Sequence, residues 1–126
     1  SPKDVYGKLF KQALDKGRER DYVKASDILT RLVAESDDYP EAWLILAASH
    51  ALGHTGKAVA AFAEYLARKP EDGAGWFFLG REYLALGLYR EAARAFRAAN
   101  EHGRDGAELW TFTGIAELKC RRFRRA

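Results

Sequence analysis

The sequence predicts an all-α protein, a solenoid of antiparallel helix hairpins, and three observations support this prediction. Between positions 75 and 99, Trp76, Leu79 and Tyr83 fall three and four residues apart, which places them on one face of a helix. Tryptophan recurs at positions 43, 76 and 110, so this pattern repeats at intervals of 33 and 34 residues. Strand signals are absent throughout. A hairpin of two short amphipathic helices cannot bury both apolar faces alone, so we expect the repeated hairpins to stack.

Alanines mark the second helix of each hairpin. They stand at positions 25, 58, 92 and 126, and each of the first three lies 18 residues before the next tryptophan. The two series together divide the 126 residues into repeats of about 4–39, 40–72 and 73–106, with a partial repeat at 107–126. We therefore expect one domain, residues 1–126, of about three and a half repeats.

The first two hairpins follow from apolar residues at helical intervals and from residues that start or stop helices. Residues 4–16 form the first helix, and Asp21 is a suitable N-cap for a second helix that ends near residue 35. Pro40 fits the first turn of a third helix, which reaches residue 52, because proline lacks the N–H that this turn leaves unpaired. Thr55 is a reasonable cap for the fourth helix, and Pro70 prevents its extension.

The third hairpin has the most complete pattern. Asp72 and Gly73 precede its first helix, and Gly87 interrupts the apolar periodicity where the chain turns into the second. Residues 101–106 are a polar connector that contains glycine. From Ala107 to about Lys119 the sequence predicts a seventh helix.

These repeats resemble the tetratricopeptide family, whose pattern is W-x2-L-G-x2-Y, then A-x3-F, then P. The third repeat matches with Trp76, Leu79, Gly80, Tyr83, Ala92 and Phe96, and has Arg104 at the proline site. The second repeat carries Trp43, Leu46, Ala47, His50, Ala58, Phe62 and Pro70. The fourth keeps Trp110 and Gly114, and the first is clear only in its second helix. The resemblance implies a right-handed α-solenoid and a role in protein–protein interaction.

Small residues stand one step after the packing face in three repeats, at Ala47, Gly80 and Gly114. Glycine inside a helix costs roughly 1 kcal/mol relative to alanine. We therefore expect these positions to allow a close approach between facing helices.

Composition and motif searches give little sign of chemistry. Lysine and arginine outnumber aspartate and glutamate by 21 to 18, a small excess that does not imply nucleic acid. A single cysteine forms no internal disulfide and leaves the cellular compartment open. No apolar run approaches the roughly 20 residues of a membrane span. We expect no membrane span and no bound nucleic acid.

No residue set resembles a catalytic or cofactor site. His50 and His54 have the spacing of two metal ligands, but Gly53 separates them and no third ligand is evident. Cys120 has no histidine nearby in the sequence, and no glycine-rich phosphate loop is present. We therefore predict a protein that is not an enzyme and binds no stoichiometric metal or cofactor.

The strongest binding signal is that two helices are apolar on more sides than hairpin packing requires. Every residue from Trp43 to Ala48 is apolar, and only Arg81 and Glu82 interrupt the run from Trp76 to Leu86. In the tetratricopeptide family, the adjacent face of each first helix lines a concave groove that holds a peptide or helix. The resemblance thus implies an apolar groove for a protein partner, lined by Leu44, Ile45, Ala48, Phe77, Phe78, Arg81, Leu84, Thr111, Phe112 and Ile115. The polar clamp by which some members hold carboxylate tails does not carry over, because Leu44, Ile45 and Phe78 fill its sites.

Other interpretations remain open at this point. The apolar residues are alternatively core, covered by flanking hairpins or by a terminal helix. The chain is alternatively a structural or oligomerisation segment of a larger protein, whose groove its own chain fills. A third hypothesis is a basic surface that contacts an acidic partner through Arg90, Arg94, Arg97 and the terminal cluster.

The fourth repeat lacks a second helix, because Ala126 falls where that helix should open. Trp110, Phe112, Ile115 and Leu118 then present an apolar face, whereas terminal repeats normally need a polar one. We expect self-association through this end, or a segment of the parent protein that covers it.

Overall fold

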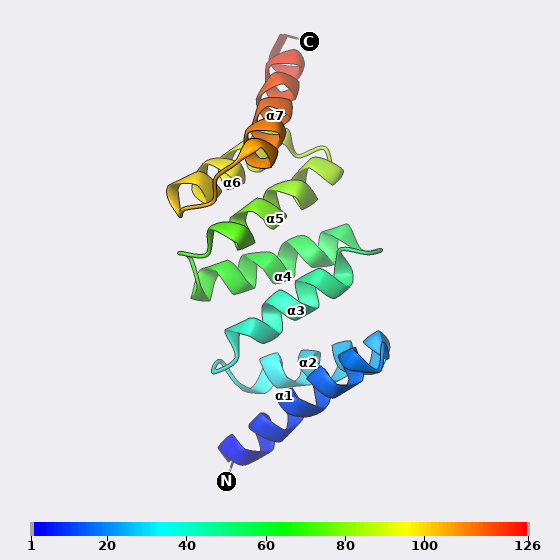
Figure 1. The fold of residues 1–126 in the computed structure, drawn as a ribbon. Helices are drawn as coiled ribbons and strands as arrows, with labels where there is room; N and C mark the ends of the chain where they lie inside the picture. The colour runs from blue at the N-terminus through cyan, green and yellow to red at the C-terminus, as the bar shows by residue number, and fades with distance from the viewer. Residues whose placement is uncertain (1, 126) are drawn as a thin grey trace.

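The computed structural model describes residues 2–125, with side chains described for 4–122, as a stack of seven helices without a strand (Figure 1). From α1 to α6 consecutive helices alternate in direction, α7 rises at a steep angle to them in this view, and α1 and α7 lie at opposite ends of the stack. Each helix packs mainly against its neighbours in the sequence, as in a repeat array. The helices are α1 (Pro2–Arg18), α2 (Tyr22–Glu35), α3 (Pro40–His50), α4 (Thr55–Arg68), α5 (Gly73–Ala85), α6 (Tyr89–Glu101) and α7 (Ala107–Arg125).

Helix starts follow the expected capping chemistry at two positions and differ at a third. The Asp21 side chain accepts from the Lys24 backbone N–H and caps α2, as predicted. Asp72 caps α5 in the same way, through the backbone N–H of Gly75 at 3.2 Å. Thr55 is not the cap of α4, because the helix begins at Thr55 itself and His54 precedes it without a side-chain cap bond.

α7 is longer than the sequence suggested, since it continues to Arg125 and does not end near Lys119. The reason lies in the turn residues. Gly87 adopts a φ of 75° where α5 gives way to α6, a conformation that glycine reaches at little cost. Arg121 stands 34 residues later in the corresponding place, and its helix continues through it.

The core consists of two apolar clusters that meet at α5. The larger one joins α1 to α5, with Ala95 of α6 at its edge, and its buried members include Leu29, Leu32, Leu46, Phe62 and Leu66. The smaller one joins α5, α6 and α7 around Phe77, Phe96 and Leu109. Trp76 and Tyr83, both half-buried, pack against both clusters and connect them.

Gly80 lies where α5 packs against the Phe96 ring of α6. A Cβ atom on Gly80 would lie 2.5 Å from Cε1 of Phe96, so no larger residue fits without movement of the ring. Ala47, the matching residue of α3, is fully buried. Gly114 differs, since a Cβ there would meet nothing within 4 Å. The close approach predicted from sequence thus exists at Gly80, whereas no part of the described chain packs on Gly114.

Candidate binding groove

Three residues of α3 and its C-terminal turn, Leu44, Ala48 and Leu52, form the wall between two apolar pockets. The first pocket lies between α3 and α5 and has a volume of 560 Å³. The second lies between α3 and the α1–α2 hairpin and has a volume of 470 Å³. Because the same three side chains line both pockets, the pockets adjoin on either side of α3, and we call the pair the groove.

Aromatic stacking holds the pocket between α3 and α5 in shape. The Phe78 ring is 40% exposed and stacks on the buried Phe62 ring of α4, with centroids 6.5 Å apart and planes at 21°. Phe77 supports Phe78 from behind, at a centroid distance of 5.6 Å. An apolar ring that is exposed and fixed in this way loses little side-chain entropy when it binds a ligand.

The polar residues of the groove lie at its α5 edge. Arg81 is exposed, and its guanidinium lies 5.4 Å from the centroid of the Phe112 ring. Glu82 is half-buried, and its Oε1 atom has no hydrogen-bond partner among the described residues. Burial raises the pKa of the Glu82 carboxyl, and the nearby Arg81 charge counteracts part of this shift. The groove is therefore apolar over most of its surface, with one cation and one carboxyl at the edge.

The structure brings together half of the residues predicted to line the groove. Leu44, Ile45, Ala48, Phe78 and Arg81 line one or both pockets. Phe77 does not, because its ring has no exposed surface and lies in the core against Phe96 and Phe112, which corrects that expectation. Phe77 and Phe78 are neighbours in one apolar run, but a helix turns by about 100° between neighbouring residues, so their rings point in different directions.

The predicted residues of the C-terminal part lie elsewhere. Leu84 and Phe112 are half-buried against the smaller core cluster. Thr111 and Ile115 are exposed on α7, and the Thr111 hydroxyl donates to the carbonyl oxygen of Ala107. None of these four residues lines either pocket of the groove.

Sequence reasoning missed three kinds of groove residue. Leu52, which is 90% exposed, follows Leu44 and Ala48 at intervals of four residues. This spacing places the three on one helix face, so it could have indicated Leu52 as a groove residue. Phe62 matches a packing position of the repeat, so nothing in the sequence indicates that it also reaches the groove. Leu14 and Tyr22 come from the first hairpin, where the repeat pattern is weakest.

The candidate metal and thiol residues lie apart from the groove. The rings of His50 and His54 are 6.3 Å apart, and burial, together with the charge of Lys57, lowers the pKa of His50. Among the side chains described, no three histidine, cysteine, aspartate or glutamate residues gather closely enough to hold an ion. Cys120 is unpaired and half-buried between α6 and α7. In the described part of the chain, no helix combines the length and the apolar character needed to cross a bilayer.

Comparisons with known proteins place the fold. No family model matches the sequence, and no curated protein sequence matches it. Solved structures do match. The Sgt2 TPR domain from Aspergillus fumigatus superimposes with a TM-score of 0.74 at 18% identity, covering 97% of this chain and 83% of that one.

Two further matches contain bound peptides. The type III secretion chaperone SycD of Yersinia enterocolitica, in complex with a peptide of the translocator YopD, has a TM-score of 0.76 at 19% identity and covers 92% of this chain and 95% of that one. The first TPR domain of Spaghetti (RPAP3), bound to the HSP90 peptide SRMEEVD, has a TM-score of 0.76 at 16% identity, with coverages of 92% and 93%. The chain therefore has the tetratricopeptide-repeat (TPR) fold, and the predicted all-α helical-repeat solenoid is confirmed.

Proposed function

We propose that this protein is a non-catalytic interaction scaffold that binds a peptide or helix of a protein partner in the groove. The observation that carries the proposal is the pair of apolar pockets that share Leu44, Ala48 and Leu52. Concave apolar surfaces with a few polar groups are the usual form of ligand sites. Exposed apolar patches on a monomer often mark a site for a partner.

The shape of the groove favours a chain-like ligand over a compact one. Its two pockets lie on either side of α3, so a ligand that fills both has to pass across Leu44 and Ala48. A peptide or helix does this with two apolar side chains that serve as anchors, one in each pocket. The bound peptides of SycD and RPAP3 are consistent with such a use of this fold.

The electrostatics of the groove favour an apolar ligand over an acidic one. Arg81 and Glu82 are the ionisable residues that line the pocket between α3 and α5, and their formal charges cancel. The remaining lining residues of that pocket are apolar. Affinity should therefore come mainly from apolar burial, at roughly 25 cal/mol per Å² before the cost of ordering the ligand.

A selection experiment tests the proposal and does not require the partner to be identified first. A phage-displayed library of random peptides is selected on the immobilised protein, and the selected peptides are synthesised and titrated by fluorescence anisotropy. We expect apolar anchor residues in these peptides. We also expect the Leu52→Asp variant to lose binding, because it places a charge beside both pockets at a position 90% exposed, where folding tolerates it.

Val23→Asp is the matched control. Val23 of α2 is 74% exposed, is equally apolar and lines neither pocket, so this variant should bind as the parent does. Circular dichroism should give the same helical signal for both variants. Peptides that bind Leu52→Asp as tightly as the parent would exclude the groove as their site.

A further inference from the structure

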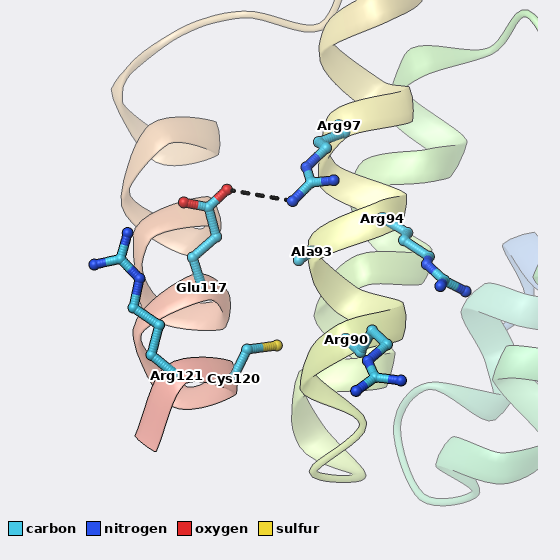
Figure 2. Close-up of a pocket in the computed structure, with 7 residues that line it drawn as sticks. All are labelled: Arg90, Ala93, Arg94, Arg97, Glu117, Cys120 and Arg121. Atoms are coloured by element: carbon cyan, nitrogen blue, oxygen red, sulfur yellow. Dashed lines mark ion pairs between the residues drawn. The ribbon is translucent and has the colours of Figure 1, made fainter. Parts of the chain in front are cut away.

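We propose that the cleft between α6 and α7 binds an acidic segment of a protein partner, at a site separate from the groove. The cleft has a volume of 690 Å³, and four arginines line it, Arg90, Arg94, Arg97 and Arg121. Three come from α6 and one from α7. Figure 2 shows Arg97 directed across the cleft toward Glu117 and Arg90 near the start of the same helix, whereas Arg94 points to the side of α6 away from α7 and Arg121 lies on the side of α7 away from α6. Ala93 and Cys120 lie between these charges.

The positive charge of the cleft is largely unbalanced. Arg97 makes a single long ion pair with Glu117, with an N–O distance of 3.9 Å. Arg90, Arg94 and Arg121 form no ion pair with any residue in the described part of the chain. Among the described lining residues, four arginines and one glutamate leave a formal charge of +3.

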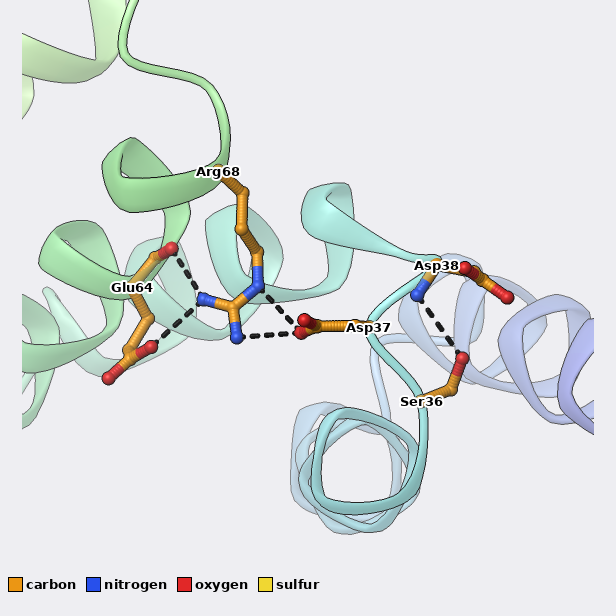
Figure 3. A network of polar contacts seen from close by, with 5 residues as sticks. All are labelled: Ser36, Asp37, Asp38, Glu64 and Arg68. Carbon is orange, nitrogen blue, oxygen red and sulfur yellow. Dashed lines mark hydrogen bonds and ion pairs between the residues drawn. The ribbon is translucent and has the colours of Figure 1, made fainter.

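Arg68 of α4 shows how this chain neutralises an arginine with a structural role. Its guanidinium contacts Asp37 at 2.8 Å and Glu64 at 2.9 Å, and so links α4 to the connection between α2 and α3 (Figure 3). In the same network the Ser36 hydroxyl accepts from the backbone N–H of Asp38, which orders that connection. Among the described residues, Arg90, Arg94 and Arg121 have no such ion-pair partner, so their donors are available to a ligand.

The repeat does not require arginine at these positions. With the helices aligned on their opening alanines, the α2 residues that match Arg90, Arg94 and Arg97 are uncharged or acidic, and the α4 residues are all small. They are Val23, Asp27 and Thr30 in α2, and Gly56, Ala60 and Ala63 in α4. Like charges three and four residues apart on a helix destabilise it by a few tenths of a kcal/mol, so packing does not explain this set.

The arrangement of the charges favours an acidic polypeptide over other anions. Arg90 and Arg97 are seven residues apart, or about 10 Å along the helix axis. Charges spread in this way suit a chain with several carboxylates better than one compact anion. Single-stranded nucleic acid is bound by basic grooves with aromatic residues on which bases stack, and none of the described side chains that line this cleft is aromatic. Arginine forms paired hydrogen bonds with carboxylates, which accounts for the choice of residue.

A fluorescein-labelled hexaglutamate peptide tests this proposal by fluorescence anisotropy. We expect saturable binding at about 0.1 M salt that weakens steeply at about 1 M, where the screening length falls from roughly 10 Å to roughly 3 Å. Hexaglutamine should not bind. The double variant Arg90→Gln with Arg94→Gln should bind about fivefold more weakly, from two exposed charge contacts. Lys8→Gln with Lys11→Gln on α1 removes the same charge from an exposed site and should change little.

A gain of affinity provides the second test, because it cannot result from loss of folding. Glu117→Gln removes the carboxylate that competes for Arg97, and it should tighten hexaglutamate binding. Asp27→Asn makes the same change of net charge on exposed α2 and should not. If Glu117→Gln and Asp27→Asn change hexaglutamate affinity equally, or if the arginine and lysine double variants do, binding depends only on the net charge of the protein. Either result would overturn the proposal. Tighter binding of an oligothymidine than of hexaglutamate would overturn the assignment to acidic protein.

Discussion

Replacing Phe77 by alanine should destabilise the protein far more than the same replacement of Phe78, its neighbour in the chain. The Phe77 ring has no exposed surface. Its centroid lies 5.6 Å from that of Phe78, 5.9 Å from that of Phe96 and 5.8 Å from that of Phe112, so it joins α5, α6 and α7. Truncation of a buried phenylalanine costs about 3–5 kcal/mol, as lost transfer energy and a residual cavity. The 126 residues imply a total stability of roughly 6–19 kcal/mol, so this is a large share.

Phe78→Ala serves as the matched comparison. Since 40% of Phe78 is already exposed, about 60% of the transfer energy of a fully buried side chain is lost, or roughly 1–2 kcal/mol. Urea unfolding followed by circular dichroism measures both variants, and peptide binding is measured on the folded fraction. Phe77→Ala should keep binding while it stays folded, whereas Phe78→Ala should lose binding and keep its fold. Equal stability losses for the two variants would refute this division between core and groove.

Three further predictions concern other parts of the molecule. Gly80→Ala should lower the free energy of unfolding by about 1–3 kcal/mol, because the new Cβ lies 2.5 Å from the Phe96 ring. Gly114→Ala should raise it by up to about 1 kcal/mol, because the new Cβ has no described atom within 4 Å. Thermal unfolding in which both variants shift the midpoint in the same direction would contradict this. Burial raises the pKa of Glu82, which means that the folded protein favours the neutral carboxyl over the charged one. This contribution to folding stability is complete in acid and is lost as the pH rises through the raised pKa. In urea titrations, Glu82→Gln should therefore match the parent in acid and be more stable than the parent at neutral pH. A difference in stability that is constant at all pH values would exclude this origin. Trp110 of α7 is 58% exposed, so we expect the protein to self-associate through this residue. Sedimentation should show association that increases with concentration and that Trp110→Ser reduces. A strictly monomeric parent protein would count against this prediction.

The fold could be predicted from the sequence because successive repeats carry packing residues of the same kind at the same spacing. Trp76 marks a first helix, Ala92 marks a second, and Gly80 marks the place where the two approach, so three copies corroborate one another. The end of α7 could not be predicted in this way. The repeat pattern suggested a turn near Lys119, whereas the local sequence there has no glycine to turn it, and the local preference decides.

The groove was predictable only in part, because periodicity gives the direction of a side chain and not its depth. Phe77 and Phe78 both belong to the apolar run of α5, yet one is core and the other is surface. The difference depends on Phe96 and Phe112, which reach Phe77 from two other helices. Leu52 escaped prediction for the opposite reason, since it lies past the end of α3 at His50, outside the helix whose faces the periodicity describes.

The dependence of groove binding on salt tests the central claim most directly. A peptide selected on the parent protein is titrated against the parent, Leu52→Asp and Val23→Asp at about 0.1 M and about 1 M salt. An apolar groove predicts nearly unchanged affinity for the parent and for Val23→Asp at both concentrations, and loss of binding for Leu52→Asp, because screening does not weaken apolar burial. Binding that collapses at about 1 M salt and survives in Leu52→Asp would contradict the account and assign recognition to charge.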